Sequence, residues 1–255
     1  DTLLHYTIWN PPGNRIRTYT GLQDEMCLVE SVRIALPDLI GSITHLEAMH
    51  EMDIHGSDFE LNCLKLRDKV NSMVHGIVHA KRNVSAAVFA NELRFYYDPI
   101  KVDYNKTYIG PGAVEMPMFV FDHLLWNCDL QDKLYTDFKE GYLPYNLHFI
   151  RQIYHRFKGK PSLLSRVEEN LKNDPSPQNY RAAVAILELC TVLKSFRMPH
   201  KRVAEEAYNQ GESHHRENGS GGYTVDILQH IIKLQQTKLS SLQARVSEHR
   251  VKVHH

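Results

Sequence analysis

The chain has 255 residues, enough for one large domain or two small ones with a sizeable core. Apolar residues make up 42% and charged residues 24%, the ordinary balance of a globular protein. The 30 basic side chains equal the 30 acidic ones in number, so no net field would hold a nucleic acid or an anionic membrane, and no apolar run is long enough to span a bilayer.

Cysteines and histidines give the next constraints. None of the four cysteines belongs to a C-x-x-C pair, which argues against a cysteine zinc cage. They lie far apart in mostly apolar surroundings, so we expect reduced core thiols and a cytoplasmic protein. Because the chain starts at Asp1, a removed leader stays open. The sixteen histidines point towards metal or proton chemistry.

The first third of the chain predicts helices after an irregular start. Residues 1–22 are expected to be irregular, with a short extended piece at His5–Trp9. A helical pattern begins at Asp24, and Pro37 should end it before it restarts. Residues 57–60 read as a capping box that opens the clearest helix, whose apolar residues repeat every three or four positions as far as Ile77.

The remaining segments are also helical. Ser85 should cap a helix that ends at Tyr97, and residues 100–115 should form a loop. Further helices are expected after Pro117, after Pro144, from Ser176 and Pro177 onward with a kink at Pro199 just before His200, and from about Thr224 to Val246. The sequence therefore predicts a single all-α domain over residues 1–255, with eight to ten helices.

Two local motifs offer chemistry, and each has an ordinary structural alternative. His75 and His79 form a helical i,i+4 pair that can bind zinc, although a solvated polar face is the simpler interpretation and Gly76 excludes the H-E-x-x-H form. The loop over 218–222 matches neither the dinucleotide fingerprint nor the P-loop. It reads as a surface loop, or as backbone amides that approach an anion beside the helix carrying His200.

In combination, three segments resemble the superfamily of tryptophan 2,3-dioxygenase and indoleamine dioxygenase, whose members are histidine-ligated heme enzymes. Residues 24–26 look like the D-E-M start of a family helix, and residues 89–97 resemble the F-x-x-F-R helix that offers an arginine to the substrate carboxylate. Residues 196–200 look like W-R-x-x-H, which supplies the proximal heme ligand. Residues 219–228 resemble the G-T-G-G loop and the V-D-Y-L that follows it.

Departures from this pattern indicate which branch of the superfamily the sequence resembles. Val32 stands where the dioxygenases carry a distal histidine, and Phe89 is one residue further from Arg94 than in the family. This profile is closer to the heme-dependent L-tyrosine 3-hydroxylases of antibiotic pathways. No histidine is followed four residues later by cysteine, so the resemblance implies non-covalent heme b instead of the covalent heme of another branch.

The resemblance implies a peroxide-using monooxygenase that converts L-tyrosine, or a related phenol, to L-DOPA. His200 would be the proximal iron ligand, with Arg197 at a heme propionate or in a surface salt bridge. His79, or else His75, would be the distal base. Substrate contacts would come from Arg94, Ser220, Gly221, Gly222 and Tyr223.

Other functions stay open on the sequence alone. They are an indole-opening heme dioxygenase, the pyrrolnitrin ring-rearranging branch, a cofactor-free helical binding protein, and a zinc enzyme using His75 and His79. The oligomeric state is also open, with a homodimer as one option.

Overall fold

The computed structural model describes residues 4–103, 106–110, 115–210 and 224–253. These residues form ten α-helices: α1 (Gln23–Met49), α2 (Ser57–Val70), α3 (Ser72–Asn83), α4 (Ala86–Val88), α5 (Glu115–Asp122), α6 (Lys133–Tyr142), α7 (His148–Phe157), α8 (Leu163–Asn173), α9 (Pro177–Gln210) and α10 (Val225–Val253). Turns of π-helix cover Leu4–Ile8, Phe89–Leu93 and His123–Asn127, and 3-10 turns cover Arg94–Tyr97 and Leu143–Tyr145. The predicted all-α fold is confirmed.

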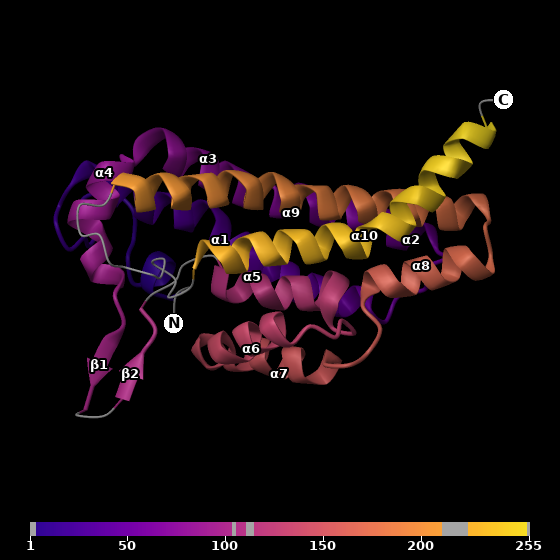
Figure 1. The fold of residues 1–255 in the computed structure, drawn as a ribbon, viewed down its shortest axis with the longest axis horizontal. Helices are drawn as coiled ribbons and strands as arrows, with labels where there is room; N and C mark the ends of the chain where they lie inside the picture. The colour runs from indigo at the N-terminus through magenta and orange to yellow at the C-terminus, as the bar shows by residue number, and fades with distance from the viewer. Residues whose placement is uncertain (1–3, 104–105, 111–114, 211–223, 254–255) are drawn as a thin grey trace.

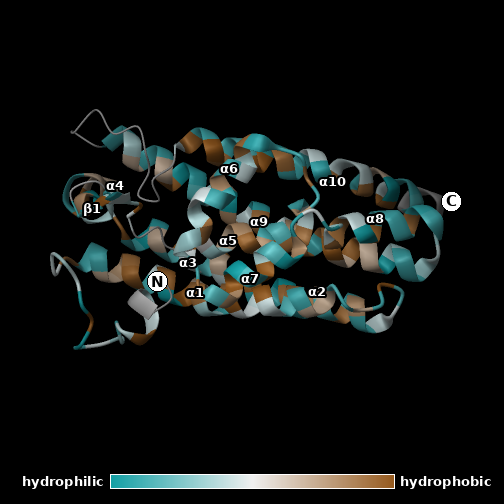
Figure 2. Ribbon diagram, turned by 90° about the horizontal axis from the view of Figure 1, so that it is seen from below, coloured by the Kyte–Doolittle hydropathy of each residue, from teal (hydrophilic) through white to brown (hydrophobic). Residues whose placement is uncertain are grey.

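The long helices set the shape of the molecule. Helices α1, α9 and α10 run along its long axis, with α6 and α7 on one side (Figure 1). Helix α9 packs against α2, α3, α8 and α10, and α1 packs against α2, α3 and α5. Brown hydrophobic residues gather where these helices face one another, and teal hydrophilic residues lie outward (Figure 2). No helix in the described part of the chain is long and apolar enough to cross a membrane.

The predicted break at Pro37 is wrong, because α1 continues through it. Pro37 is exposed, while its neighbours Leu36 and Leu39 are fully buried. The carbonyl that loses its helical donor therefore lies on the solvent side, where water can satisfy it. Burial of the opposite face keeps the helix intact.

Helix starts were predicted with mixed success. The capping box at residues 57–60 is wrong, because Ser57 is already helical and the preceding Gly56 makes no side-chain cap. The helix that follows is also divided at Asn71 into α2 and α3. The cap at Ser85 is confirmed, since its hydroxyl accepts the Val88 amide. Pro117 is the third residue of α5, and Pro144 lies in a 3-10 turn before α7.

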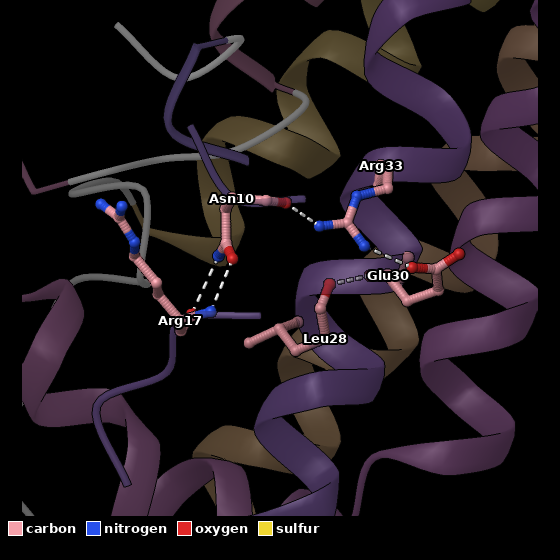
Figure 3. A network of polar contacts seen from close by, with 6 residues as sticks. Asn10, Arg17, Leu28, Glu30 and Arg33 are labelled. Carbon is pink, nitrogen blue, oxygen red and sulfur yellow. Dashed lines mark hydrogen bonds and ion pairs between the residues drawn. The ribbon is translucent and has the colours of Figure 1, made fainter. Parts of the chain in front are cut away.

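The N-terminal segment is more ordered than the prediction of an irregular 1–22. Leu4–Ile8 forms a π-helical turn, so the extended piece expected there is wrong. Asn10 is buried and exchanges two hydrogen bonds with the backbone of Arg17, at 2.8 and 2.7 Å. Arg33 on α1 donates to the Asn10 carbonyl and pairs with Glu30 at 2.8 Å (Figure 3). These contacts tie the segment to α1.

A β-hairpin replaces the loop predicted over 100–115. Strands β1 (Ile100–Val102) and β2 (Lys106–Tyr108) pair antiparallel, with Lys101 opposite Thr107, and project from the helices (Figure 1). Gly110 follows at the base of the hairpin. A Cβ there would lie 2.2 Å from the Tyr97 carbonyl oxygen, so only glycine allows this close approach.

The main core draws side chains from α1, α2, α3 and α5 to α10. All four cysteines are free thiols, and three of them are buried. Burial raises the pKa of Cys63 and of Cys128 to about 12, so these thiols stay protonated and unreactive. The expectation of core thiols is confirmed for Cys63, Cys128 and Cys190, whereas Cys27 is half-buried.

Candidate functional site

The two histidines of α3 differ in their surroundings. His75 is exposed, and its Nε2 lies 3.2 Å from the side-chain amide of Asn71. His79 is half-buried. Its Nε2 is shielded from solvent and has no hydrogen-bond partner in the described part of the chain. The two side chains are therefore unequal, and His79 is the one suited to meet a ligand.

A close helix crossing fixes His79. A Cβ on Gly76 would lie 2.6 Å from the Ser31 carbonyl oxygen and 3.3 Å from the Ala35 Cβ. Glycine therefore lets α1 and α3 approach more closely than any larger residue would. His79 follows Gly76 by three residues, so this crossing sets its height along the bundle. The same glycine that excludes the zinc-protease motif is required for packing.

Cross-helix ion pairs show the register between α2 and α9. Arg67 pairs with Glu188 at 2.6 Å, and Glu60 pairs with Arg181 at 3.3 Å. Each pair joins residues 121 apart in the sequence, as expected for two helices that run parallel. His79 and His200 have the same separation, and α3 contacts α9. Extended across the break at Asn71, the register of α2 would place His79 level with His200 on the contacting helices α3 and α9.

His200 lies on α9 and is half-buried. Its ring stacks on Phe196, with 5.4 Å between ring centroids and 11° between planes. The predicted kink at Pro199 does not end the helix, which continues to Gln210. A stacked imidazole with limited solvent contact is suited to ligate a metal through one ring nitrogen.

Arg94 follows a π-helical turn that explains a departure from the family pattern. The Arg94 amide donates to the Phe89 carbonyl, which closes a five-residue turn. A π-turn contains one residue more than an α-turn, so the five-residue spacing from Phe89 to Arg94 stacks these residues as four would in an α-helix. The extra residue in the sequence is therefore absorbed locally.

Arg94 faces the end of α9. Its guanidinium lies 5.9 Å from the ring centroid of Tyr208, and Asn91 donates to the Gln210 carbonyl at 3.4 Å. Burial raises the pKa of Tyr208, against the lowering effect of Arg94. His200, Ala204 and Tyr208 follow one another on one face of α9. Arg94 is thus about two helical turns, roughly 12 Å, beyond His200 along the axis.

The D-E-M segment has structural roles that the sequence did not reveal. Asp24 accepts the Ser85 amide at 2.7 Å and so anchors the start of the segment that ends in Arg94. Glu25 is buried and accepts the amides of Tyr19 and Thr20 at 2.6 and 2.8 Å. Val32, also buried, packs in an apolar cluster with Leu93. The same cluster contains the buried rings of Tyr6 and Tyr97, and position 32 itself is apolar.

Arg197 is not the surface residue that one prediction allowed. It is 4% exposed, and it pairs with Asp122 and donates to Gln235 at 2.9 Å. Asp122 also accepts the hydroxyl of Tyr135 at 2.7 Å and the indole N–H of Trp126 at 2.9 Å. The surface salt bridge is therefore wrong. The propionate contact stays a prediction that would compete with Asp122. Residue types and spacing gave no signal for this network.

Four predicted substrate contacts lie outside the described residues: Ser220, Gly221, Gly222 and Tyr223. A groove formed by described residues lies elsewhere. It has a volume of about 420 Å³ and is lined in part by Glu60, Tyr180, Glu188 and His249. Glu188 is roughly 18 Å along α9 from His200. This groove contains none of the predicted site residues.

The donors at this end of the bundle fit a histidine-ligated heme. His200 offers an imidazole on α9, and His79 of the contacting helix α3 offers a shielded nitrogen without a partner in the described residues. Arg94 adds a cation two turns away. In the described residues no group of three or more potential metal-binding side chains occurs, so the residues for a three-ligand zinc site are not assembled there.

A comparison with protein-family models gives an independent result. The model described as monodechloroaminopyrrolnitrin synthase PrnB matches residues 1–252. The match spans all the predicted site residues, including those outside the described part of the chain.

Proposed function

Since the chain belongs to the monodechloroaminopyrrolnitrin synthase (PrnB) family, a heme-dependent branch of the tryptophan/indoleamine 2,3-dioxygenase-like superfamily, we propose that it hydroxylates L-tyrosine to L-DOPA with hydrogen peroxide in antibiotic biosynthesis. Family membership supports a heme-dependent oxidoreductase. The shielded Nε2 of His79, on a helix that contacts α9, supports the finer proposal, because it could supply a distal imidazole although position 32 is apolar.

Each residue has a separate task in this proposal. His200 gives a ring nitrogen to the iron of a non-covalent heme b, which supplies the oxidising chemistry when bound. His79 accepts a proton from peroxide or holds the substrate phenol through its shielded Nε2. Arg94 pairs with the tyrosine carboxylate, which would replace its contact with the Tyr208 ring.

The stoichiometry defines the test. Tyrosine and hydrogen peroxide give DOPA and water, so one peroxide oxygen enters the ring. The heme-loaded protein should convert L-tyrosine to DOPA with peroxide in the absence of dioxygen, as seen by mass spectrometry with ¹⁸O-labelled peroxide. Unlabelled DOPA, or no product with peroxide, contradicts the proposal.

The family description names a synthase of monodechloroaminopyrrolnitrin, and so it supports a second candidate, the reaction of the pyrrolnitrin ring-rearranging branch. L-tryptophan should therefore be tested in parallel with L-tyrosine. A ring-opened or rearranged indole product, without turnover of tyrosine, would favour this second function. The apolar surroundings of Val32 argue against the dioxygenase form, because that form carries a histidine at this position.

A further inference from the structure

The helix that carries His200 is weakened directly before this residue. Pro199 has no amide hydrogen, so the Ser195 carbonyl loses its helical donor, and the proline ring crowds that turn. His200 follows Pro199 directly. Within α9 its ring has the stacking contact with Phe196, but the backbone turn before it has lost a helical hydrogen bond.

Arg197 supplies a contact on the N-terminal side of this defect. It is the last fully buried residue before Pro199 on α9, and its two terminal nitrogens reach different helices. One donates to Asp122 at the end of α5, and the other donates to Gln235 on α10 at 2.9 Å. The contact therefore fixes both the rotation and the height of the α9 turn that precedes His200.

Asp122 is held from further directions. Its carboxylate is 1% exposed and accepts Tyr135 of α6 and Trp126 of the following π-turn, as well as Arg197. A buried carboxylate with three donors has little freedom to move, and its charge is compensated by the guanidinium. Asp122 is thus a rigid point to which α9 is attached.

We propose that the buried Asp122–Arg197 ion pair is a positioning device for His200, and that Arg197 acts on the heme only through it. This inference rests on the proposed function, because it concerns the histidine that would ligate the iron. The two residues are positioning residues. The proposal gives Arg197 a different role from that of a ligand to a heme propionate. If Arg197 turned to a propionate, the buried Asp122 would lose the guanidinium with which it is paired.

A double-mutant cycle separates these two roles. The variants are Asp122→Asn, Arg197→Met and the double variant. Glu205→Gln serves as the control, because it removes the partly exposed Lys201–Glu205 pair on the same helix. The readouts are the iron–histidine stretching band of the ferrous heme-loaded protein, the Kd for heme, and amide hydrogen exchange over residues 196–200 without heme.

Both single variants should shift or broaden the band in the same way, weaken heme binding about tenfold, and accelerate exchange. The double variant should resemble either single one, and Glu205→Gln should resemble the wild type. If Arg197→Met weakens heme binding while Asp122→Asn leaves the band and Kd unchanged, Arg197 acts directly and the inference is overturned. An unchanged band in all variants also overturns it.

Two further outcomes are informative. If Arg197→Met does not fold, Arg197→Lys, which keeps the charge without the two-armed contact, takes its place with the same expectations. A wild-type protein that takes up no heme overturns the proposed function, and this inference with it. A wild-type protein that takes up heme, combined with unaffected variants, overturns the inference alone.

Discussion

At the scale of single residues, His79 and His75 occupy the same helix one turn apart but differ in access to solvent. His75 is exposed, whereas the Nε2 of His79 is shielded from solvent. The sequence prediction favoured His79 as the distal base and kept His75 as the alternative. Burial, which depends on the packing of α1 against α3, separates them.

Replacing His79 with alanine tests this difference. Loss of a general base or of a phenol contact should lower turnover of tyrosine by about 10²- to 10⁴-fold while the heme is retained. His75→Ala is the matched control, one turn away, and should keep wild-type turnover. Equal effects of the two substitutions in steady-state kinetics would show that neither histidine has a distal role.

Arg94 is the residue predicted to select an amino acid. Arg94→Met should raise the Kd for tyrosine roughly tenfold or more, because a charge-assisted hydrogen bond contributes about 1.5–3 kcal/mol. Arg82→Met, which removes an exposed arginine near the end of α3, should leave the Kd unchanged. Spectral titration with tyrosine measures both. An unchanged Kd in Arg94→Met would exclude the carboxylate contact.

At the scale of elements, the sequence predicted most helices but not their interruptions. Hydrophobic spacing located α2 and α9 well, since a repeating apolar face reports burial directly, whereas no helix was predicted where α8 lies. The π-turn before Arg94 could not be predicted, because its one extra residue reads in the sequence as a mismatch. The hairpin of β1 and β2 was also missed, since its short strands are exposed and carry no alternating pattern.

The crossing of α1 and α3 gives a prediction at this scale. Gly76→Ala should lower the free energy of unfolding by about 1–3 kcal/mol, because the new methyl group would collide with the Ser31 backbone. It should also lower turnover by moving His79. Gly141→Ala is the control: a Cβ there meets nothing within 4 Å, and the substitution should stabilise α6 by about 0.5–1 kcal/mol. Urea denaturation measures the free energy of unfolding of both variants. Equal values for Gly76→Ala and Gly141→Ala would contradict the close crossing of α1 and α3.

At the scale of the whole molecule, two buried histidines make folding sensitive to acid. Burial lowers the pKa of His50 from 6.5 to about 4 and that of His123 from 6.5 to about 3. The unfolded chain therefore binds protons that the folded protein does not. Their contribution to stability is complete above pH 6.5 and is lost as the pH falls towards those values.

The free energy of unfolding should thus fall between pH 6.5 and 5 by up to about 1.4 kcal/mol per pH unit for each histidine. His123→Phe, which keeps a ring against Tyr154, should remove about half of this slope. Urea denaturation at several pH values measures both proteins. A flat wild-type profile across this window, or the same slope in the variant, would show that these histidines do not control the response.

The sequence predicted only part of the candidate site. The order of Arg94, His200 and the loop over 219–223 suggested the superfamily, which the family match supports at the coarser level. The buried network around Asp122 escaped prediction because its members lie far apart in the sequence and belong to no motif. Long-range polar contacts of this kind depend on tertiary packing, which spacing along one helix does not reveal.

The most direct test of the account is the absorption spectrum of the protein after addition of heme. The wild type should show a Soret band that shifts when tyrosine is added, and His230→Ala, which alters a partly buried histidine of α10, should show the same band. His200→Ala should lose most of its bound heme, and added imidazole should restore the band by replacing the missing ligand. Unchanged heme content and spectrum in His200→Ala would contradict the central claim.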